Sequence, residues 1–129
     1  DETKRKKGHD NFIKSLSKNK EIVIREEKCY KNNDRYKQKG VDTFITIYLV
    51  HIKEDFPSIK KIILLSSDTD FCPVIRDIKN RNDIDVILYS YFDKKRHSKF
   101  SVSNELLSCC SKYIQLTKQD FEEAKLEKC

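Results

Sequence analysis

The sequence lacks an apolar run long enough to cross a membrane. Its longest mostly apolar stretch, 44–52, is interrupted by Thr46 and His51, whereas a spanning helix needs about 20 apolar residues. No charged segment followed by an apolar one opens the chain, so no secretory signal peptide is visible. We therefore expect no membrane as a partner.

Paired cysteine motifs are also missing. The chain has five cysteines, an odd number, and no CxxC pair. A zinc site and a full disulfide framework are therefore not expected, and no Asn-x-Ser/Thr glycosylation sequon occurs. These absences predict an intracellular protein in a reducing compartment.

The composition that is present suits one domain with a polyanionic partner. The 129 residues are 37% hydrophobic and 37% charged, so the core must come from a few concentrated segments. The formal net charge of +6 favours a partner such as RNA. A solvated lysine-rich surface is the alternative explanation.

Apolar periodicity predicts alternating helices and strands. Residues 1–11 contain no apolar side chain and are expected to form a basic, polar arm. Helices are predicted at about 12–16, 43–54, 71–78, 104–112 and 118–128, and strands at 21–26, 62–66, 85–91 and 113–116, with a polar loop at 29–40. The alternation predicts an α/β fold with a mostly parallel sheet flanked by helices.

Two aspartates follow the predicted strand 62–66, in the turn Ser-Ser-Asp-Thr-Asp. Ligands bind beyond the carboxyl ends of parallel strands. Taken singly, Asp70 could cap the helix that starts at Phe71, and Asp42 or Thr43 could cap the start of the helix 43–54. If Asp42, Asp68 and Asp70 meet, they make an oxygen-rich pocket that suits Mg²⁺ or Mn²⁺ and the hydrolysis of a phosphodiester.

Four segments in order resemble the NYN domain, a branch of the PIN-like nucleases. They are QKGVDTFITIYLV (38–50), IILLSSDTDFCPVIRDIK (62–79), DVILYSY (85–91) and SVSNELLSCCSKYIQL (101–116). The resemblance covers about 12–118, with a charged helix at 119–129 beyond it, and implies a three-layer PIN-like fold. It also implies that Asp42, Asp68 and Asp70 are the catalytic, metal-binding positions of an RNA-cleaving centre that uses Mg²⁺ or Mn²⁺.

The chain departs from the family pattern at several positions. Ser67 and Thr69 replace the two glycines of the acidic turn, and Tyr48 occupies a position that is often acidic. These nucleases open with a strand that ends in an aspartate, and nothing before Phe12 matches that strand. We therefore hypothesise that the chain is the C-terminal part of a larger polypeptide.

Basic residues near the expected site form a candidate RNA-binding surface, because lysine and arginine contact phosphate without reading sequence. A solvated loop is the alternative for the segment 93–99. The candidate RNA-binding residues are Lys37, Lys39, Lys94, Lys95, Arg96, His97, Lys99 and Ser103.

Three functions compete at this point. The first is a metal-dependent endoribonuclease, and the second is a catalytically degraded module of the same fold that binds RNA or scaffolds an assembly. The third is a phosphatase of the haloacid dehalogenase type, which is disfavoured because Cys72 stands where that family's motif has threonine or valine. Whether the protein forms a homodimer or a larger complex is left open.

Overall fold

The structure is a computed structural model, and it describes residues 1–26, 29–32, 35–38, 40–91 and 102–124. The chain divides into two compact units, Asp1–Val41 and Asp42–Cys129, and each is described by itself. No helix in the described ranges is both long and apolar enough to cross a membrane.

The first unit holds one helix and one hairpin. Helix α1 (Glu2–Leu16) begins at Asp1, whose carboxylate accepts a hydrogen bond from the Lys4 backbone N–H at 3.3 Å. Strands β1 (Cys29–Asn32) and β2 (Arg35–Gln38) pair antiparallel. The polar residues expected as an arm are therefore helical, and α1 has no buried residue.

Two predictions for this unit are wrong. Residues 22–26 are not a strand, although they are rich in β-branched side chains, and β1 and β2 lie within the segment expected to be a loop. Strand propensity describes how side chains fit a paired, half-buried surface, so it fails for 22–26, which pairs with no strand in the described part of the chain. The hairpin escaped prediction because its polar residues show no apolar alternation.

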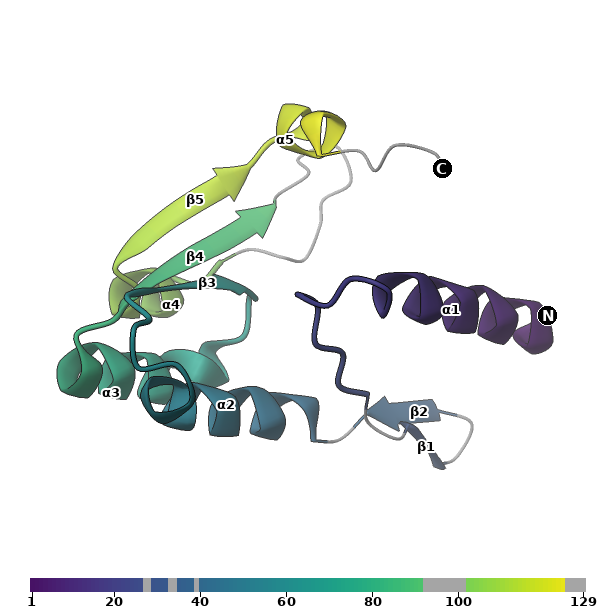
Figure 1. Cartoon of the computed structure of the whole chain (residues 1–129), viewed down its shortest axis with the longest axis horizontal. Coiled ribbons are helices and arrows are strands. Elements are labelled where there is room, and N and C mark those ends of the chain that lie inside the picture. The colour runs from purple at the N-terminus through teal and green to yellow at the C-terminus, as the bar shows by residue number, and fades with distance from the viewer. Residues whose placement is uncertain (27–28, 33–34, 39, 92–101, 125–129) are drawn as a thin grey trace. The chain divides into compact units, whose positions relative to one another are not determined.

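The second unit is a parallel three-stranded sheet with helices, which confirms the predicted α/β fold (Figure 1). Its strands lie in the order β3-β4-β5, and both pairs are parallel. The elements are α2 (Val41–Asp55), β3 (Lys61–Leu65), the 3₁₀ helix η1 (Thr69–Phe71), α3 (Cys72–Asn82), β4 (Asp85–Tyr91), α4 (Asn104–Cys109), β5 (Lys112–Leu116) and α5 (Lys118–Glu123).

One face of the sheet packs into the core. Leu64, Val86 and Leu88 are buried together with residues of α3 and α4 and with Leu49 of α2. The opposite face is defined by register, since Ile63 pairs with Ile87 and Leu65 with Tyr89. We call this second surface the open face; its apolar residues are Ile63, Leu65, Ile87, Tyr89, Tyr91, Ile114 and Leu116, and the register places Lys61, Asp85 and Lys112 on the same side.

Local side-chain and backbone conformations fix the ends of helices α3, α4 and α5. Ser103 caps α4 by accepting from the Leu106 N–H at 3.1 Å. Thr117 and Asp120 form a complete capping box at the start of α5. Helix α3 ends at Asp83, whose φ of 51° lies in the left-handed region that asparagine, aspartate and glycine tolerate best.

Candidate functional site

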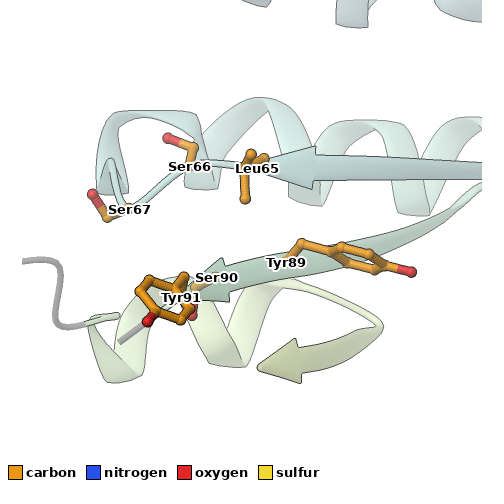
Figure 2. A pocket seen from close by; sticks show the side chains of 6 residues that line it. All are labelled: Leu65, Ser66, Ser67, Tyr89, Ser90 and Tyr91. Atoms are coloured by element: carbon orange, nitrogen blue, oxygen red, sulfur yellow. The ribbon is translucent and has the colours of Figure 1, made fainter. Parts of the chain in front are cut away.

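A pocket of about 460 Å³ lies at the carboxyl ends of β3 and β4. Figure 2 shows the side chains that line it: Leu65, Ser66, Ser67, Tyr89, Ser90 and Tyr91. This is the edge at which parallel sheets bind ligands. The hydroxyl groups of serine and tyrosine can both donate and accept hydrogen bonds, so the pocket can hold a polar ligand against an apolar floor.

The acidic turn continues directly from this pocket. Its hydrogen bonds are local: the Asp68 N–H donates to Ser66 Oγ at 3.1 Å, and Asp68 Oδ1 accepts from the Asp70 N–H at 2.9 Å. Asp68 is therefore the N-cap of η1. The sequence suggested Asp70 as the cap of a helix from Phe71, and that assignment is wrong because a 3₁₀ turn over Thr69–Phe71 comes first.

The two aspartates of the turn consequently differ. Asp68 is half-buried and uses one carboxylate oxygen as a cap, which leaves the other oxygen for a ligand. Asp70 is exposed in the first turn of η1. Both residues follow directly in the chain after Ser66 and Ser67, which line the pocket.

Asp42 lies in the first turn of α2 and is exposed. Because the helix begins at Val41, Asp42 is its second residue and not its N-cap. Its backbone carbonyl accepts a hydrogen bond from Thr46 Oγ1 at 2.8 Å. Gly40 precedes the helix with a φ of 102°, a conformation that strongly favours glycine.

The fit of a metal ion depends on how many of these groups meet. Over the ranges that the structure describes, no three His, Cys, Asp or Glu side chains form a group that could hold a metal. Mg²⁺ is often bound by one or two carboxylates, with waters and substrate phosphates completing its shell. The neighbouring pair of Asp68 and Asp70 therefore fits such an ion in ligand type, provided that a phosphate contributes.

The buried cysteines do not offer an alternative chemistry. Cys72 Sγ lies 3.3 Å from Cys109 Sγ, and Cys110 is also buried. Burial is the main cause that raises the pKa of the Cys72 thiol to about 11. Burial also raises the pKa of the Cys109 and Cys110 thiols, so all three favour the protonated form rather than the nucleophilic, metal-binding thiolate near neutral pH.

The candidate RNA-binding residues are only partly within the described ranges. Ser103 is half-buried and its hydroxyl caps α4, which gives it a structural role. Lys37 belongs to β2 in the first unit. The others, Lys39, Lys94, Lys95, Arg96, His97 and Lys99, lie outside the described residues.

Sequence reasoning missed the pocket residues of β4. The sequence predicts a strand over 85–91 and no role for Tyr89, Ser90 and Tyr91, yet these three residues line the pocket beside Ser66 and Ser67. The available signal was their position, since they end the strand next to the acidic turn. Ser90 is also buried, and its hydroxyl is 2.9 Å from the Tyr113 hydroxyl.

Comparison with known proteins places the chain by family and by fold. The NYN domain profile matches residues 2–117. A crystal structure of a protein of unknown function from Vibrio parahaemolyticus has a similar fold, with a TM-score of 0.62 at 21% sequence identity. That similarity covers 86% of this chain and 62% of the other, so this chain spans less than two thirds of its neighbour. No curated protein matches.

Proposed function

Because this chain belongs to the NYN domain family, whose fold is that of the PIN-like nucleases, we propose that it is a metal-dependent endoribonuclease domain. Its substrate is RNA, and its cofactor is Mg²⁺ or Mn²⁺. The observation that carries this proposal is the adjacency of the Asp68–Asp70 turn and the hydroxyl-lined pocket at one edge of the sheet.

Asp68 and Asp70 are the proposed metal ligands, with Asp42 as a further catalytic carboxylate. When bound, the ion would lower the pKa of a water and offset charge on the phosphodiester. The chain's own part is to hold the substrate. Ser66 and Ser67 can donate hydrogen bonds to phosphate oxygens, and the exposed Tyr91 offers an aromatic surface.

Basic side chains supply the proposed affinity for RNA. A net charge of +6 attracts the polyanion before any specific contact forms. We include the lysines, the arginine and the histidine named above, from Lys37 to Lys99, as proposed phosphate contacts. Ser103 is retained as a weaker member of that set because its hydroxyl already caps α4.

Two observations favour a second function. The described residues contain no group of three side chains that could bind a metal. One carboxylate oxygen of Asp68 already accepts the hydrogen bond from the Asp70 N–H that caps η1. A degraded nuclease fold that binds RNA or scaffolds an assembly would have these properties. Both functions use the same RNA-binding surface. Only the nuclease cleaves the RNA, and only cleavage requires the carboxylates.

Labelled single-stranded RNA incubated with the full-length protein and Mn²⁺ separates them. We expect cleavage by the wild type and at least about a hundredfold slower cleavage by Asp68→Asn and Asp42→Asn, a size typical of lost electrostatic stabilisation. Asparagine is as good an N-cap as aspartate, so Asp68→Asn keeps the local fold. Asp83→Asn, at the end of α3, is the matched control and should cleave like the wild type.

RNA affinity is measured in parallel by fluorescence anisotropy. Binding without cleavage, unchanged in Asp68→Asn, would establish the degraded module instead. Turnover of a small phosphomonoester with the RNA left intact would point to a phosphatase. Cleavage that persists in both asparagine variants would exclude these carboxylates as the catalytic groups.

A further inference from the structure

The positive charge of the chain is concentrated in one of its two units. Residues 1–41 contain 13 lysines and arginines and 7 aspartates and glutamates, so this unit has the whole formal net charge of +6. Residues 42–129 contain 14 of each kind and have no net charge. The unit that holds the acidic turn and the pocket therefore has no excess positive charge, although its proposed substrate is a polyanion.

Helix α1 places three lysines of the first unit in one row. Lys4, Lys7 and Lys14 are spaced by three and seven residues, so they lie on one side of the helix. At a rise of about 1.5 Å per residue, the row is roughly 15 Å long. All three side chains are exposed, and none forms an ion pair with a residue that the structure describes. We call this row the basic face.

The opposite side of α1 contacts another segment of its own unit. His9, Phe12 and Leu16 share that side, because they are spaced by three and four residues. The His9 ring nitrogen Nε2 lies 3.0 Å from a carboxylate oxygen of Glu26. This acidic group therefore meets α1 away from the basic face, and the three ammonium groups stay unpaired in the described part of the unit.

We propose that the basic face of α1 binds the phosphate backbone of RNA, at a surface separate from the pocket. The choice of RNA as the polyanion rests on the proposed function. Lysine ammonium groups contact phosphate oxygens without reading the bases, so this surface raises the affinity for RNA of any sequence. It contributes more to that affinity than an equal number of lysines in the second unit, whose charges cancel.

A membrane surface is another anionic partner that a basic helix can meet. Helices that lie on membranes present a broad apolar side as well as a basic one. In α1 the apolar side chains are Phe12, Ile13 and Leu16, which all lie near its carboxyl end, and the rest of the helix is polar apart from one glycine. The composition of α1 therefore favours RNA over lipid headgroups.

The test is the affinity of the full-length protein for a fluorescein-labelled oligouridine, measured by anisotropy at several salt concentrations in EDTA. The combined change Lys4→Gln, Lys7→Gln and Lys14→Gln should weaken binding at least about tenfold at low salt. The slope of log K against log salt should fall by about 2, because each lost contact to a single strand contributes about 0.7. Glutamine forms helices about as well as lysine, so α1 is retained.

A matched control removes the same charge from the second unit. Lys60→Gln, Lys61→Gln and Lys112→Gln change exposed lysines at the amino ends of β3 and β5, away from the acidic turn. This combined variant should bind oligouridine within about twofold of the wild type, since salt screens charges that lie outside the contact.

A change of the opposite sign sharpens the test. Asp10 is the only acidic residue between Lys4 and Lys14. Asp10→Asn should strengthen binding by about twofold, because it removes a charge that repels phosphate beside the basic face.

Three results would overturn the proposal. One is a wild type that does not bind oligouridine. Another is equal weakening by the two triple variants, which would mean that net charge decides the affinity and not this surface. The third is an RNA affinity that survives the changes in α1; if binding to vesicles of phosphatidylserine and phosphatidylcholine is lost instead, the basic face belongs to a membrane.

The nuclease proposal is tested separately by cleavage in Mn²⁺. Asp68→Asn should bind oligouridine in EDTA as the wild type does, because its carboxylate lies outside the basic face. Loss of turnover with intact binding would therefore concern the nuclease proposal alone. Cleavage that continues in a protein whose affinity ignores the α1 lysines would contradict only the proposal for α1.

Discussion

The two faces of the sheet in the second unit are built from similar residues and have opposite environments. On the face toward the helices, Val86 is 1% exposed and Leu88 is fully buried. On the open face, Ile63 and Leu65 are among the most exposed apolar side chains that the structure describes. Strand β3 contributes to both faces, so composition alone does not decide which side chain is covered.

The contrast between the two faces shows which side of the sheet contributes most to the stability of the second unit. Parallel sheets are almost always covered on both faces. Here the buried cluster gathers α2, α3 and α4 on one face, while α5 reaches the open face through the edge-to-face contact between Phe121 and Tyr91. The buried side chains of this unit therefore gather on the covered face, and we expect most of its stability to come from there.

The largest expected effect compares one leucine from each face. Leu88→Ala should lower the free energy of unfolding by about 2–5 kcal/mol, because it removes buried methyl groups and leaves a cavity. Leu65→Ala should change it by less than about 0.5 kcal/mol in dilute protein, since that side chain is 69% exposed. Urea unfolding measures both, and equal losses of the free energy of unfolding would contradict the comparison.

How much of this arrangement the sequence predicts depends on the strength of each local signal. The segment 43–54 reads as a helix and lies inside α2, and the strand 85–91 coincides with β4. The hydroxyl caps at Ser103 and Thr117 depend on side-chain chemistry within a few residues, which is the kind of feature that a sequence specifies locally. The pairing of strands is different from capping. A strand at 21–26 would need a neighbouring strand, and the residues of the segment itself cannot specify one.

The candidate site also has features that the local sequence specifies and features that depend on distant residues. Its location at the end of β3 follows from the position of the acidic turn, whereas the assignment of the cap to Asp70 failed because a 3₁₀ turn shifts the helix start. The meeting of Asp42 with the pair is a long-range property that no spacing fixes, so it stays a prediction. The family resemblance, confirmed over residues 2–117, supplied what local patterns could not.

A smaller effect would sharpen the view of the open face. The ring centroids of Tyr91 and Phe121 are 5.1 Å apart, with an interplanar angle of 82°. A double-mutant cycle of Tyr91→Leu and Phe121→Leu should give a coupling of about 0.5–1.5 kcal/mol. A cycle of Tyr113→Leu with Phe121→Leu should be additive, because Tyr113 instead bonds Ser90 from the other side of the sheet. A coupling free energy of zero in the first cycle would mean that the ring contact between Tyr91 and Phe121 does not stabilise the packing of α5 on the open face.

The smallest effect concerns the capping box that starts α5, the helix that carries Phe121. The Thr117 backbone N–H and hydroxyl donate to the Asp120 carboxylate at 2.6 and 2.8 Å, and these bonds lower the pKa of Asp120. The folded protein therefore favours the ionised form, so the contribution to stability is present above the ordinary aspartate pKa of about 3.9. It is lost as the pH falls through the lowered folded pKa.

Replacing this carboxylate should accordingly have an effect only where it is ionised. Asp120→Asn should reduce the melting temperature slightly at pH 7, and the difference from the wild type should shrink toward zero as the pH is lowered through the acidic range. Asp83→Asn, an exposed change at the far end of α3, is the control and should show no such convergence. A difference that stays constant in acid would mean that the Asp120 side chain acts through packing rather than through its charge, and the attachment of α5 to the open face would then be independent of pH.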